Sequence, residues 1–446
     1  MRNLERALLL FLVAISGTTS ASPAASLKVG PGKHFSKIED ANNAAKPGDI
    51  ILVYPLEDGK PYEKTAVYVR QPRLTFRAVP ADGKTWVPIS GKGFDYSGKG
   101  STPRAIFQFN PGTDNCLLEG FELTDAHNNS HNGAGVRINQ ANHVTIRNCN
   151  IHDNDMGIMS GGDGTQRRAV DQRIEHCRLH HNGNFEDPGY NHNLYLGGTS
   201  VALRFCDIHH SLTGHNVKSR AHHTRIEYCY VHDSANREFD LVDATDTERS
   251  ESHAVILGCI IVKNPQTKGN RTVLHFGQDG GREHDGTVTL AFNTIVTPFI
   301  SPIVELSTPQ AKARLIGNLV TDGGRRQANQ QIVRARNGAK PENANGKYNF
   351  FSGNFSPPPL ASFDANLNMF RRFKDPLFVA PAEHDYRLRP PIIGSLTVRM
   401  PRTVLDLPVF PGAKLSLSDA PLTWQYVHPA ERGKRGLDPP LTVGAH

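Results

Sequence analysis

Short runs in which apolar and polar positions alternate dominate the middle of this chain. One seven-residue phrase places aliphatic residues at positions one and six, cysteine at four and histidine at seven. It occurs at Ile146–His152, Ile174–His180, Leu203–His209 and Ile226–His232, and Ile256–Val262 keeps the cysteine but not the histidine. Phe121 extends the register upstream, and Asn293 and Asn318 extend it downstream. A repeat in the twenties, built from short β-type runs, is typical of a solenoid whose successive coils lie about 4.8 Å apart.

Each coil divides into three strands. In the coil 214–233 we expect strands at 216–220, 224–226 and 229–231, and Ile226, Cys229 and Val231 point inward across a corner. Aligning the first strands of the coils predicts one outward stack of Arg137, Met159, Tyr195, Lys218, Val242, His275 and Glu305. Asn193, Asn216 and Asp240 are predicted to form the adjacent outward row.

Both ends of the chain differ from this repeat. Phe35, Ile38, Ala41 and Ala45 share one helical face, which predicts a short helix that caps the solenoid. Three prolines at 357–359 mark a boundary. We therefore predict a signal peptide at 1–25, a parallel β-helix at 26–350 and a proline-rich segment at 351–446 that packs along it.

The N-terminus predicts export. Arg2 and Arg6 precede the apolar run Ala7–Ala14, and small residues follow, with cleavage expected near Ala21 or Ala25. No run is long enough to span a membrane, so membrane insertion is not expected. The mature protein should be secreted or periplasmic, and we expect a monomer.

Composition favours an anionic partner. The formal net charge is +7 and the sequence pI about 9.0, which fits an acidic polysaccharide. No dense Lys/Arg run occurs, so nucleic acid is not expected. Five of the six cysteines share the repeat register, so a buried ladder of free thiols is expected rather than disulfides, and the role of Cys116 stays open.

This arrangement resembles the right-handed parallel β-helix proteins of the pectin-lyase-like class, over roughly residues 26–350. The phrases Asn191–Gly197 and Gly214–Ala221 are similar to a subgroup of exported bacterial β-helix proteins. The resemblance implies an all-β fold, a right-handed parallel β-helix. Because that fold carries lyases, hydrolases, epimerases, esterases and inert fibres, it does not decide the activity.

Histidines are concentrated in the repeats: 17 of the 21 lie between His127 and His284. His152, His180, His209 and His232 occupy one register. They either form a stacked imidazole ladder that fills a corner or hold a metal, although no short zinc motif occurs.

The candidate active residues lie on the first strands. Lys218 and Arg220 stand two apart and face the same way, with Tyr195 one coil away. Cleavage of an acidic polysaccharide by β-elimination needs a base, a cation for the developing charge and an acid. We assign Lys218 as base, Arg220 as the carboxylate-binding cation, and Tyr195 or His215 as the acid. Substrate binding is assigned to Asn193, Asn216, His192 and Asp240, in a groove walled by loops 183–190 and 233–238.

The segment Val217–Ser219 is similar to the lysine-containing strand of β-helix alginate and chondroitin lyases. Those enzymes pair the lysine with an arginine on the following coil. Here that coil reads Asp240–Ala244 and carries no arginine, so Arg220 has to serve instead.

Other activities stay open. C5-epimerisation uses the same first step as elimination. A glycoside hydrolase would use acidic residues near Glu238 and Asp240. Glu238, Asp240 and Asp243 are also candidate ligands for Ca²⁺. The third class is a non-catalytic glycan-binding or surface β-helix.

Overall fold

The structure is a computed structural model that describes residues 24–243, 250–279, 283–299, 301–324 and 329–352, and parts of 354–445. The signal-peptide prediction falls on residues 1–25, of which 1–23 lie outside the described residues. No helix among the described residues is both long enough and apolar enough to cross a membrane.

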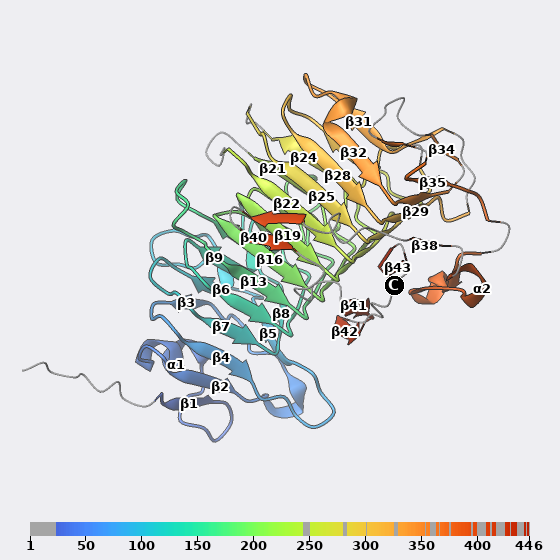
Figure 1. Cartoon of the computed structure of the whole chain (residues 1–446). Coiled ribbons are helices and arrows are strands. Elements are labelled where there is room, and N and C mark those ends of the chain that lie inside the picture. The colour runs from blue at the N-terminus through green and yellow to red at the C-terminus, as the bar shows by residue number, and fades with distance from the viewer. Residues whose placement is uncertain are drawn as a thin grey trace, which may run out of the picture.

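Three parallel sheets wind along one axis, and each coil gives one strand to each sheet (Figure 1). The first sheet consists of β3 (Val67–Val69), β6 (Ala105–Phe109), β9 (Ala134–Asn139), β12 (Met156–Gly161), β15 (Leu194–Leu196), β18 (Val217–Ser219), β21 (Phe239–Asp243), β24 (Leu274–Gln278), β27 (Val304–Leu306) and β31 (Val333–Ala335). The expected parallel β-helix is confirmed.

The second sheet consists of β1 (Ser26–Val29), β2 (Ile50–Val53), β4 (Thr75–Ala78), β7 (Leu117–Glu119), β10 (Thr145–Arg147), β13 (Gln172–Glu175), β16 (Ser200–Arg204), β19 (His223–Glu227), β22 (His253–Leu257), β25 (Thr287–Ala291), β28 (Lys312–Ile316) and β32 (Ala344–Lys347). The third consists of β5 (Val87–Ser90), β8 (Phe121–Thr124), β11 (Asn150–His152), β14 (Arg178–His180), β17 (Asp207–His209), β20 (Tyr230–His232), β23 (Ile260–Val262), β26 (Thr294–Val296), β29 (Leu319–Thr321), β33 (Phe350–Phe351) and β35 (Met369–Phe370). Parallel pairing therefore continues past residue 350, where we expected the β-helix to end.

The corner between the second and third strands is made by one residue in the left-handed region. The φ angles are 48° at Asn148, 53° at His176, 53° at Phe205, 51° at Tyr228 and 62° at Gly258. Left-handed backbone is costly for bulky residues. Here the bulky side chains stack on one another, with ring centroids 5.1 Å apart for His176–Phe205 and 5.5 Å for Phe205–Tyr228. This residue produces the phase slip that places both Ile226 and Cys229 inside.

The cysteine ladder is confirmed. Cys149, Cys177, Cys206, Cys229 and Cys259 are fully buried and free. Asn293 and Asn318 continue the column as predicted, and the Nδ2 of Asn293 donates to the Oδ1 of Asn318 at 3.0 Å. Cys116 is also a buried free thiol, and burial raises its pKa to about 12. The cysteine and asparagine side chains of this column thus fill the interior of the β-helix.

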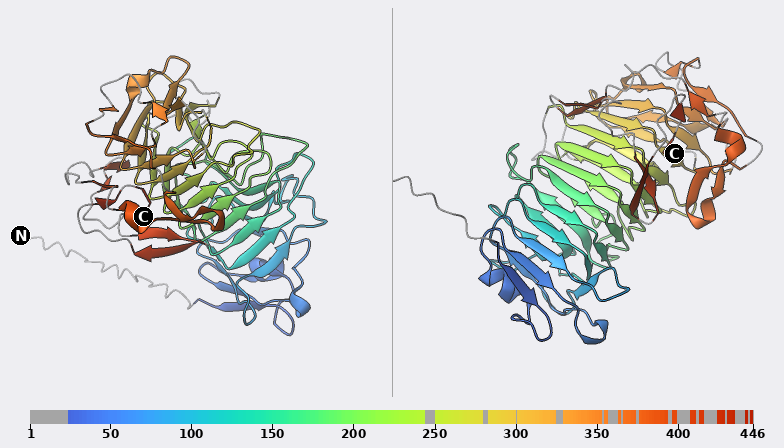
Figure 2. Two further views of the ribbon diagram at one scale, coloured as in Figure 1. Left: turned by 90° about the vertical axis from the view of Figure 1, so that its right-hand side faces the viewer. Right: turned by 60° about the horizontal axis from the view of Figure 1, so that its bottom comes forward.

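A helix caps the N-terminal end of the β-helix, and the C-terminal segment packs along its side. Helix α1 (Ile38–Ala44) contacts β1, β2 and β3 and buries Ile38 and Ala41, so the predicted cap is confirmed. Part of the C-terminal segment lies against the outer face of the third sheet, where Tyr386 and Tyr426 pack with Tyr230 (Figures 1 and 2). Its described elements include the hairpins β36–β37 (Phe378–Ala380, Asp385–Leu388), β39–β40 (Leu407–Phe410, Ala413–Leu415) and β41–β42 (Trp424–Val427, Glu431–Lys434), the pair β38–β43 (Thr397–Val398, Leu441–Thr442), α2 (Pro390–Ile393) and β34 (Phe355–Ser356), which pairs with β30 (Gln330–Gln331). Its strand β39 contacts β22 of the second sheet.

The register of the first sheet corrects one alignment. Lys218 pairs with Asp240, Asp240 with His275, and His275 with Glu305. Asp240, not Val242, therefore stands in the outward stack beside Lys218. A shift of two residues keeps every side chain on its own face, so the alternation of apolar residues cannot detect it.

Candidate active site

Two of the eight predicted site residues lie inside the β-helix. Asn193 and Asn216 have no exposed surface. The Nδ2 of Asn193 donates to the Oδ1 of Asn216 at 2.8 Å, and the Nδ2 of Asn216 donates to Glu238 at 2.6 Å. Each asparagine precedes its strand at a corner, where the chain turns and the side chain faces inward. The prediction that they bind substrate was wrong, because they are a buried hydrogen-bonded ladder.

Glu238 ends this ladder and is equally inaccessible. Its carboxylate and the ammonium of Lys263 form a 3.5 Å ion pair in which neither side chain has exposed surface. Burial raises the pKa of Glu238. The prediction that Glu238 could act on a substrate is therefore also wrong.

The other six predicted residues line one cleft of about 290 Å³ on the outer face of the first sheet. They are Lys218, Arg220, Tyr195, His215, His192 and Asp240. Gly189, Tyr190, Arg237, His275 and Asp279 complete the lining. Both predicted wall loops contribute, 183–190 through Tyr190 and 233–238 through Arg237. The cleft thus brings together six of the residues that the sequence predicted to form the site.

Lys218 and Arg220 share one carboxylate. The Oδ2 of Asp279 lies 2.5 Å from the Nζ of Lys218 and 2.6 Å from a terminal nitrogen of Arg220. Burial opposes ionisation of Asp279, but hydrogen bonds from Lys218 and Arg220 outweigh it and lower its pKa. Asp279 comes from the end of β24, two coils after Lys218, and its side chain is 37% exposed. The two cations thus form a binding site for a carboxylate at the surface of the cleft.

Asp240 is the buried anion beneath this pair. Its carboxylate lies 3.2 Å from Lys218, 3.3 Å from Arg237 and 2.8 Å from the Nδ1 of His275. Burial opposes its ionisation, but the nearby His215, His275 and Lys218 hold the pKa of Asp240 well below its usual range. Asp240 therefore positions the cations of the cleft.

His192 and His215 present N–H groups to the cleft. The Nδ1 of His192 accepts the backbone N–H of His215 at 3.0 Å, and the Nδ1 of His215 accepts that of Arg237 at 3.2 Å. Burial lowers the pKa of His215 to about 4 and that of His192 well below its usual value, so both rings are neutral at pH 7. A neutral ring that accepts at Nδ1 carries its proton on Nε2. The Nε2 of His215 faces the Oδ2 of Asp240 at 3.5 Å, so the Nε2–H of His192 is the one that remains for an anionic ligand.

Tyr195 lies beside both cations. The Nζ of Lys218 is 5.9 Å and the guanidinium carbon of Arg220 is 5.5 Å from the centre of its ring. Tyr195 and Arg220 also border a second hollow of about 180 Å³, lined by Gly161, Gly162, Gly197 and Gly198 among others. The two hollows therefore adjoin across Tyr195, which makes room for a ligand longer than one sugar.

The predicted Ca²⁺ ligands are not brought together. Among the described residues, the groups of three or more potential metal ligands are Asp207 with His209 and His232, and His210 with His232 and Asp233. Glu238 is held inside by Lys263, Asp240 faces the cleft, and Asp243 borders a separate small cavity with His253 and His284. Asp246, a further candidate carboxylate, lies outside the described residues.

Sequence reasoning missed Arg237 and Asp279. The coil after Lys218 does supply an arginine to the cleft, but from the turn before β21 rather than from the strand. Asp279 follows a conformationally special glycine, since Gly277 has a φ of 146° and a Cβ there would meet the side chain of Ser307. Only the glycine is a signal in the sequence, and it does not reveal the contact.

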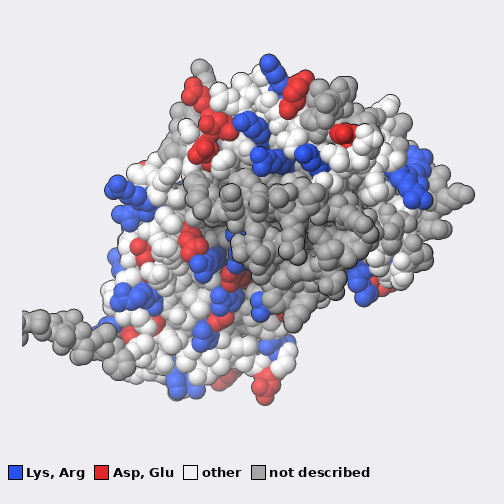
Figure 3. All heavy atoms as spheres, viewed as in Figure 1, with Lys and Arg blue, Asp and Glu red and all other residues white. Residues whose placement is uncertain are grey.

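Where it can be seen (Figure 3), the outer face of the second sheet carries charges of both signs. Basic and acidic side chains are interspersed on the side seen in Figure 3. Ion pairs join neighbouring coils there, at 2.8 Å for Arg77–Glu119, 2.9 Å for Arg147–Glu175 and 2.7 Å for Arg204–Glu227. The cleft on the first sheet is thus the better binding face for an acidic ligand.

Residues 119–296 match a family model described as a right handed beta helix region. The protein is a right-handed parallel β-helix. Solved structures with a similar course include pectate lyase Pel9A, with 14% identity, a TM-score of 0.47, and coverage of 96% of this chain and 97% of that one. A GH136 lacto-N-biosidase from Eubacterium ramulus has 11% identity, a TM-score of 0.39 and coverage of 78% and 68%.

A pectin methylesterase from carrot has 10% identity, a TM-score of 0.30, and coverage of 80% of this β-helix and 90% of the esterase. At these levels of similarity the neighbours carry no inference about activity. A comparison with curated proteins found no match. The residues that line the cleft are therefore the basis for assigning an activity to this β-helix.

Proposed function

We propose that this β-helix is an exported enzyme that cleaves a uronate-containing polysaccharide by β-elimination in the Lys218–Arg220 cleft. The observation that carries the proposal is the position of Asp279. Its carboxylate lies within 2.6 Å of both cations, so the cleft already holds a carboxylate between an ammonium and a guanidinium. We propose that the carboxylate of the substrate takes this position and displaces Asp279.

Elimination starts with removal of the proton next to the uronate carboxylate. Negative charge then spreads onto the carboxylate, and Lys218 and Arg220 stabilise it where it develops. Lys218 was expected to be the base. Its nitrogen lies 2.5 Å from the carboxylate of Asp279 and 3.2 Å from that of Asp240, in the position where the substrate carboxylate would bind, so we assign it to electrostatic stabilisation.

We therefore assign the proton transfers to Tyr195. Its ring centre lies 5.9 Å from the Nζ of Lys218 and 5.5 Å from the guanidinium carbon of Arg220, and the proposed reaction uses its hydroxyl as the phenolate. The phenolate takes the proton from the carbon next to the carboxylate, and the electron pair forms the ring double bond. The bond from the ring to the departing sugar oxygen breaks, that oxygen leaves with its electron pair, and Tyr195 returns the proton to it. His192 donates a hydrogen bond to the substrate through Nε2, and His215 contacts Asp240 through Nε2.

Hydrolysis fits this cleft less well. A glycosidase needs a carboxylic acid whose raised pKa keeps it protonated beside the substrate. The pKa values of Asp240 and Asp279 are lowered, and Glu238, whose pKa is raised, has no access to the cleft. Elimination needs no protonated carboxyl group.

Tyr195→Phe tests the assignment because it removes one hydroxyl and keeps the ring. We expect turnover of a uronate polymer to fall about 10²–10⁴-fold while affinity for a saturated oligouronide stays within about twofold. Tyr68→Phe is the matched control, because Tyr68 lies on β3 of the same sheet beside Arg70, away from the cleft. Normal turnover by folded Tyr195→Phe would remove Tyr195 from the mechanism.

A further inference from the structure

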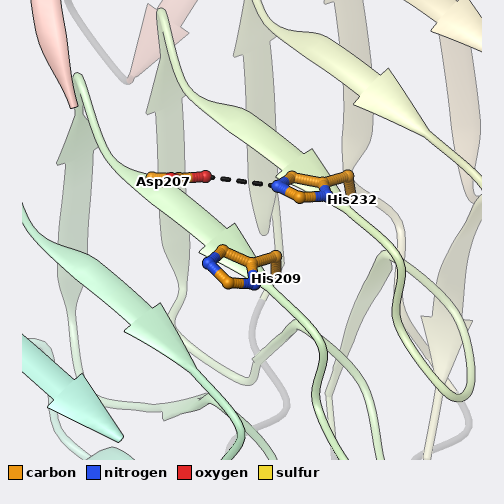
Figure 4. A group of neighbouring side chains, drawn as sticks. All are labelled: Asp207, His209 and His232. Carbon is orange, nitrogen blue, oxygen red and sulfur yellow. Dashed lines mark hydrogen bonds and ion pairs between the residues drawn. The ribbon is translucent and has the colours of Figure 1, made fainter. Parts of the chain in front are cut away.

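The imidazole ladder on the third sheet ends beside a buried carboxylate. Its predicted stacking is confirmed, with ring centroids 4.7 Å apart for His152–His180, 4.8 Å for His180–His209 and 4.8 Å for His209–His232. Asp207 lies on β17 two residues before His209. Figure 4 shows its carboxylate beside the last two rings. This cluster lies on a different sheet from the cleft.

Within the described part of the chain, Asp207 is hydrogen-bonded through its Oδ1, and its Oδ2 has only the longer contacts to Arg178 and His428. Its side chain is 1% exposed, and its Oδ1 lies 3.3 Å from the Nε2 of His232. Within the described part of the chain, its Oδ2 has no hydrogen-bond partner, and the Nε of Arg178 is 3.8 Å away. A buried carboxylate oxygen without such a partner is costly, so this atom is set up for a ligand.

The two rings are oriented so that their Nε2 atoms remain for this ligand. The Nδ1 of His232 contacts Asp233 at 2.7 Å, and the Nδ1 of His209 contacts the Nδ1 of His210 at 2.8 Å. Earlier in the ladder, Nε2 has an acceptor on the preceding coil, Glu122 for His152 and Asn150 for His180. At His209 that position is Arg178, which only donates.

A fourth potential ligand comes from the C-terminal segment. The Nδ1 of His428 lies 3.7 Å from the free Oδ2 of Asp207. His428 stacks on His384 with centroids 5.2 Å apart, and His384 in turn hydrogen-bonds to Tyr230 at 2.8 Å. Residues far apart in the sequence thus meet at one carboxylate.

We propose that Asp207, His209, His232 and His428 bind one divalent transition metal ion of the zinc class. Three imidazoles and one carboxylate are a ligand set for zinc and its first-row neighbours rather than for Ca²⁺. Zinc–ligand distances of about 2.0–2.1 Å place the ligand atoms of a tetrahedron about 3.3 Å apart.

Asp207 and His232 already have this separation, and the ligand atoms of Asp207, His209 and His232 all lie within 4.8 Å of one another. His428 is not part of this close group, and its Nδ1 contacts the hydroxyl of Tyr426 at 3.2 Å, so the proposal requires it to leave that contact and move toward the other three ligands. The metal takes the place of the proton that His232 and Asp207 would otherwise share, while Asp233 orients the ring from its other nitrogen. Four protein ligands make a closed, structural site, which fastens the C-terminal segment to the β-helix.

The test is a titration of untagged, chelator-treated full-length protein with Zn²⁺, followed by calorimetry, and with Co²⁺, followed by visible absorbance. We expect one ion per chain, the absorption bands of tetrahedral Co²⁺, and a melting temperature that rises with zinc. Asp207→Asn should weaken binding at least about 100-fold and His428→Ala at least about tenfold, because each removes a ligand.

His152→Ala is the matched control, since it shortens the same ladder away from Asp207 and should leave binding unchanged. Melting curves without metal show whether each variant folds, and His428, which is partly exposed, is the safer change. Absence of stoichiometric binding to the wild type would overturn the proposal. Wild-type affinity in both Asp207→Asn and His428→Ala would overturn it as well, because the metal would then sit on other histidines.

Discussion

Replacing Asp279 by asparagine should make the cleft bind a uronate oligosaccharide more tightly. In the free protein Asp279 occupies the position that we assign to the substrate carboxylate, so binding has to break its contacts with Lys218 and Arg220. Asparagine keeps the shape but removes the competing charge. The substrate then meets two cations that no longer hold an internal carboxylate.

The magnitude follows from the exposure of that contact. Hydrogen bonds to charged groups contribute about 1.5–3 kcal/mol each when shielded, but a side chain that is 37% exposed is screened by solvent. We therefore expect about 0.5–1 kcal/mol per contact, or about 1–2 kcal/mol in all. At about 1.4 kcal/mol per factor of ten, this corresponds to a dissociation constant about 5–30-fold lower.

Isothermal titration with a saturated oligouronide measures this change. Glu186→Gln is the control for net charge, because Glu186 lies in the loop 183–190, is 79% exposed and lines neither hollow of the groove. It should change affinity less than twofold. Weaker binding by Asp279→Asn would show that Asp279 does not compete with the substrate carboxylate. Loss of turnover with unchanged affinity would also contradict this competition, since Asp279 would then act on the substrate itself.

Three further changes follow from the same contacts. Arg220→Lys keeps the charge but loses the planar fork, so affinity for the oligouronide should fall about tenfold in the same titration. Asn216→Ala leaves Asn193 and Glu238 without their buried partner, which should lower the free energy of unfolding by about 3 kcal/mol in urea denaturation; a loss below about 1 kcal/mol would contradict the ladder. Burial lowers the pKa of His215 to about 4, from about 6.5 in the unfolded chain. Between these two values the unfolded chain binds a proton that the folded protein does not. The free energy of unfolding should therefore fall by on the order of 3 kcal/mol from this ring as the pH drops from 6.5 to 4. His215→Asn should flatten that dependence, and an unchanged slope would argue against a neutral His215.

The fold could be predicted because the same pattern of apolar residues, cysteine and histidine recurs in successive coils. Cys149 to Cys259 and the aliphatic residues around them return in one register, and a wrong alignment of one coil would contradict its neighbours. The same pattern placed Tyr195 and Lys218 on one outward stack. An alignment error of one residue would have placed both side chains inside the β-helix, so the alternation of apolar residues alone excludes such an error.

The other site residues could not be placed from the alternation of apolar and polar residues along the strands. A shift of two residues preserves both faces, so Val242 and Asp240 were equally compatible with the pattern. Asn193 and Asn216 share the parity of the outward residues but stand at a corner, where parity no longer gives direction. Arg237 and Asp279 come from turns, whose conformation depends on packing between coils that no local pattern records.

Incubation of the full-length protein with a panel of uronate polymers distinguishes β-elimination from hydrolysis and shows whether the substrate carboxylate is required. Ultraviolet absorbance of unsaturated sugar ends and the release of reducing ends are followed in the same samples, with a carboxyl-reduced polymer as control. We expect both signals to rise together on at least one uronate polymer and neither to rise on the reduced control. Reducing ends without absorbance would show hydrolysis and contradict elimination. Equal cleavage of the reduced polymer would contradict the role of Lys218 and Arg220 as a carboxylate site.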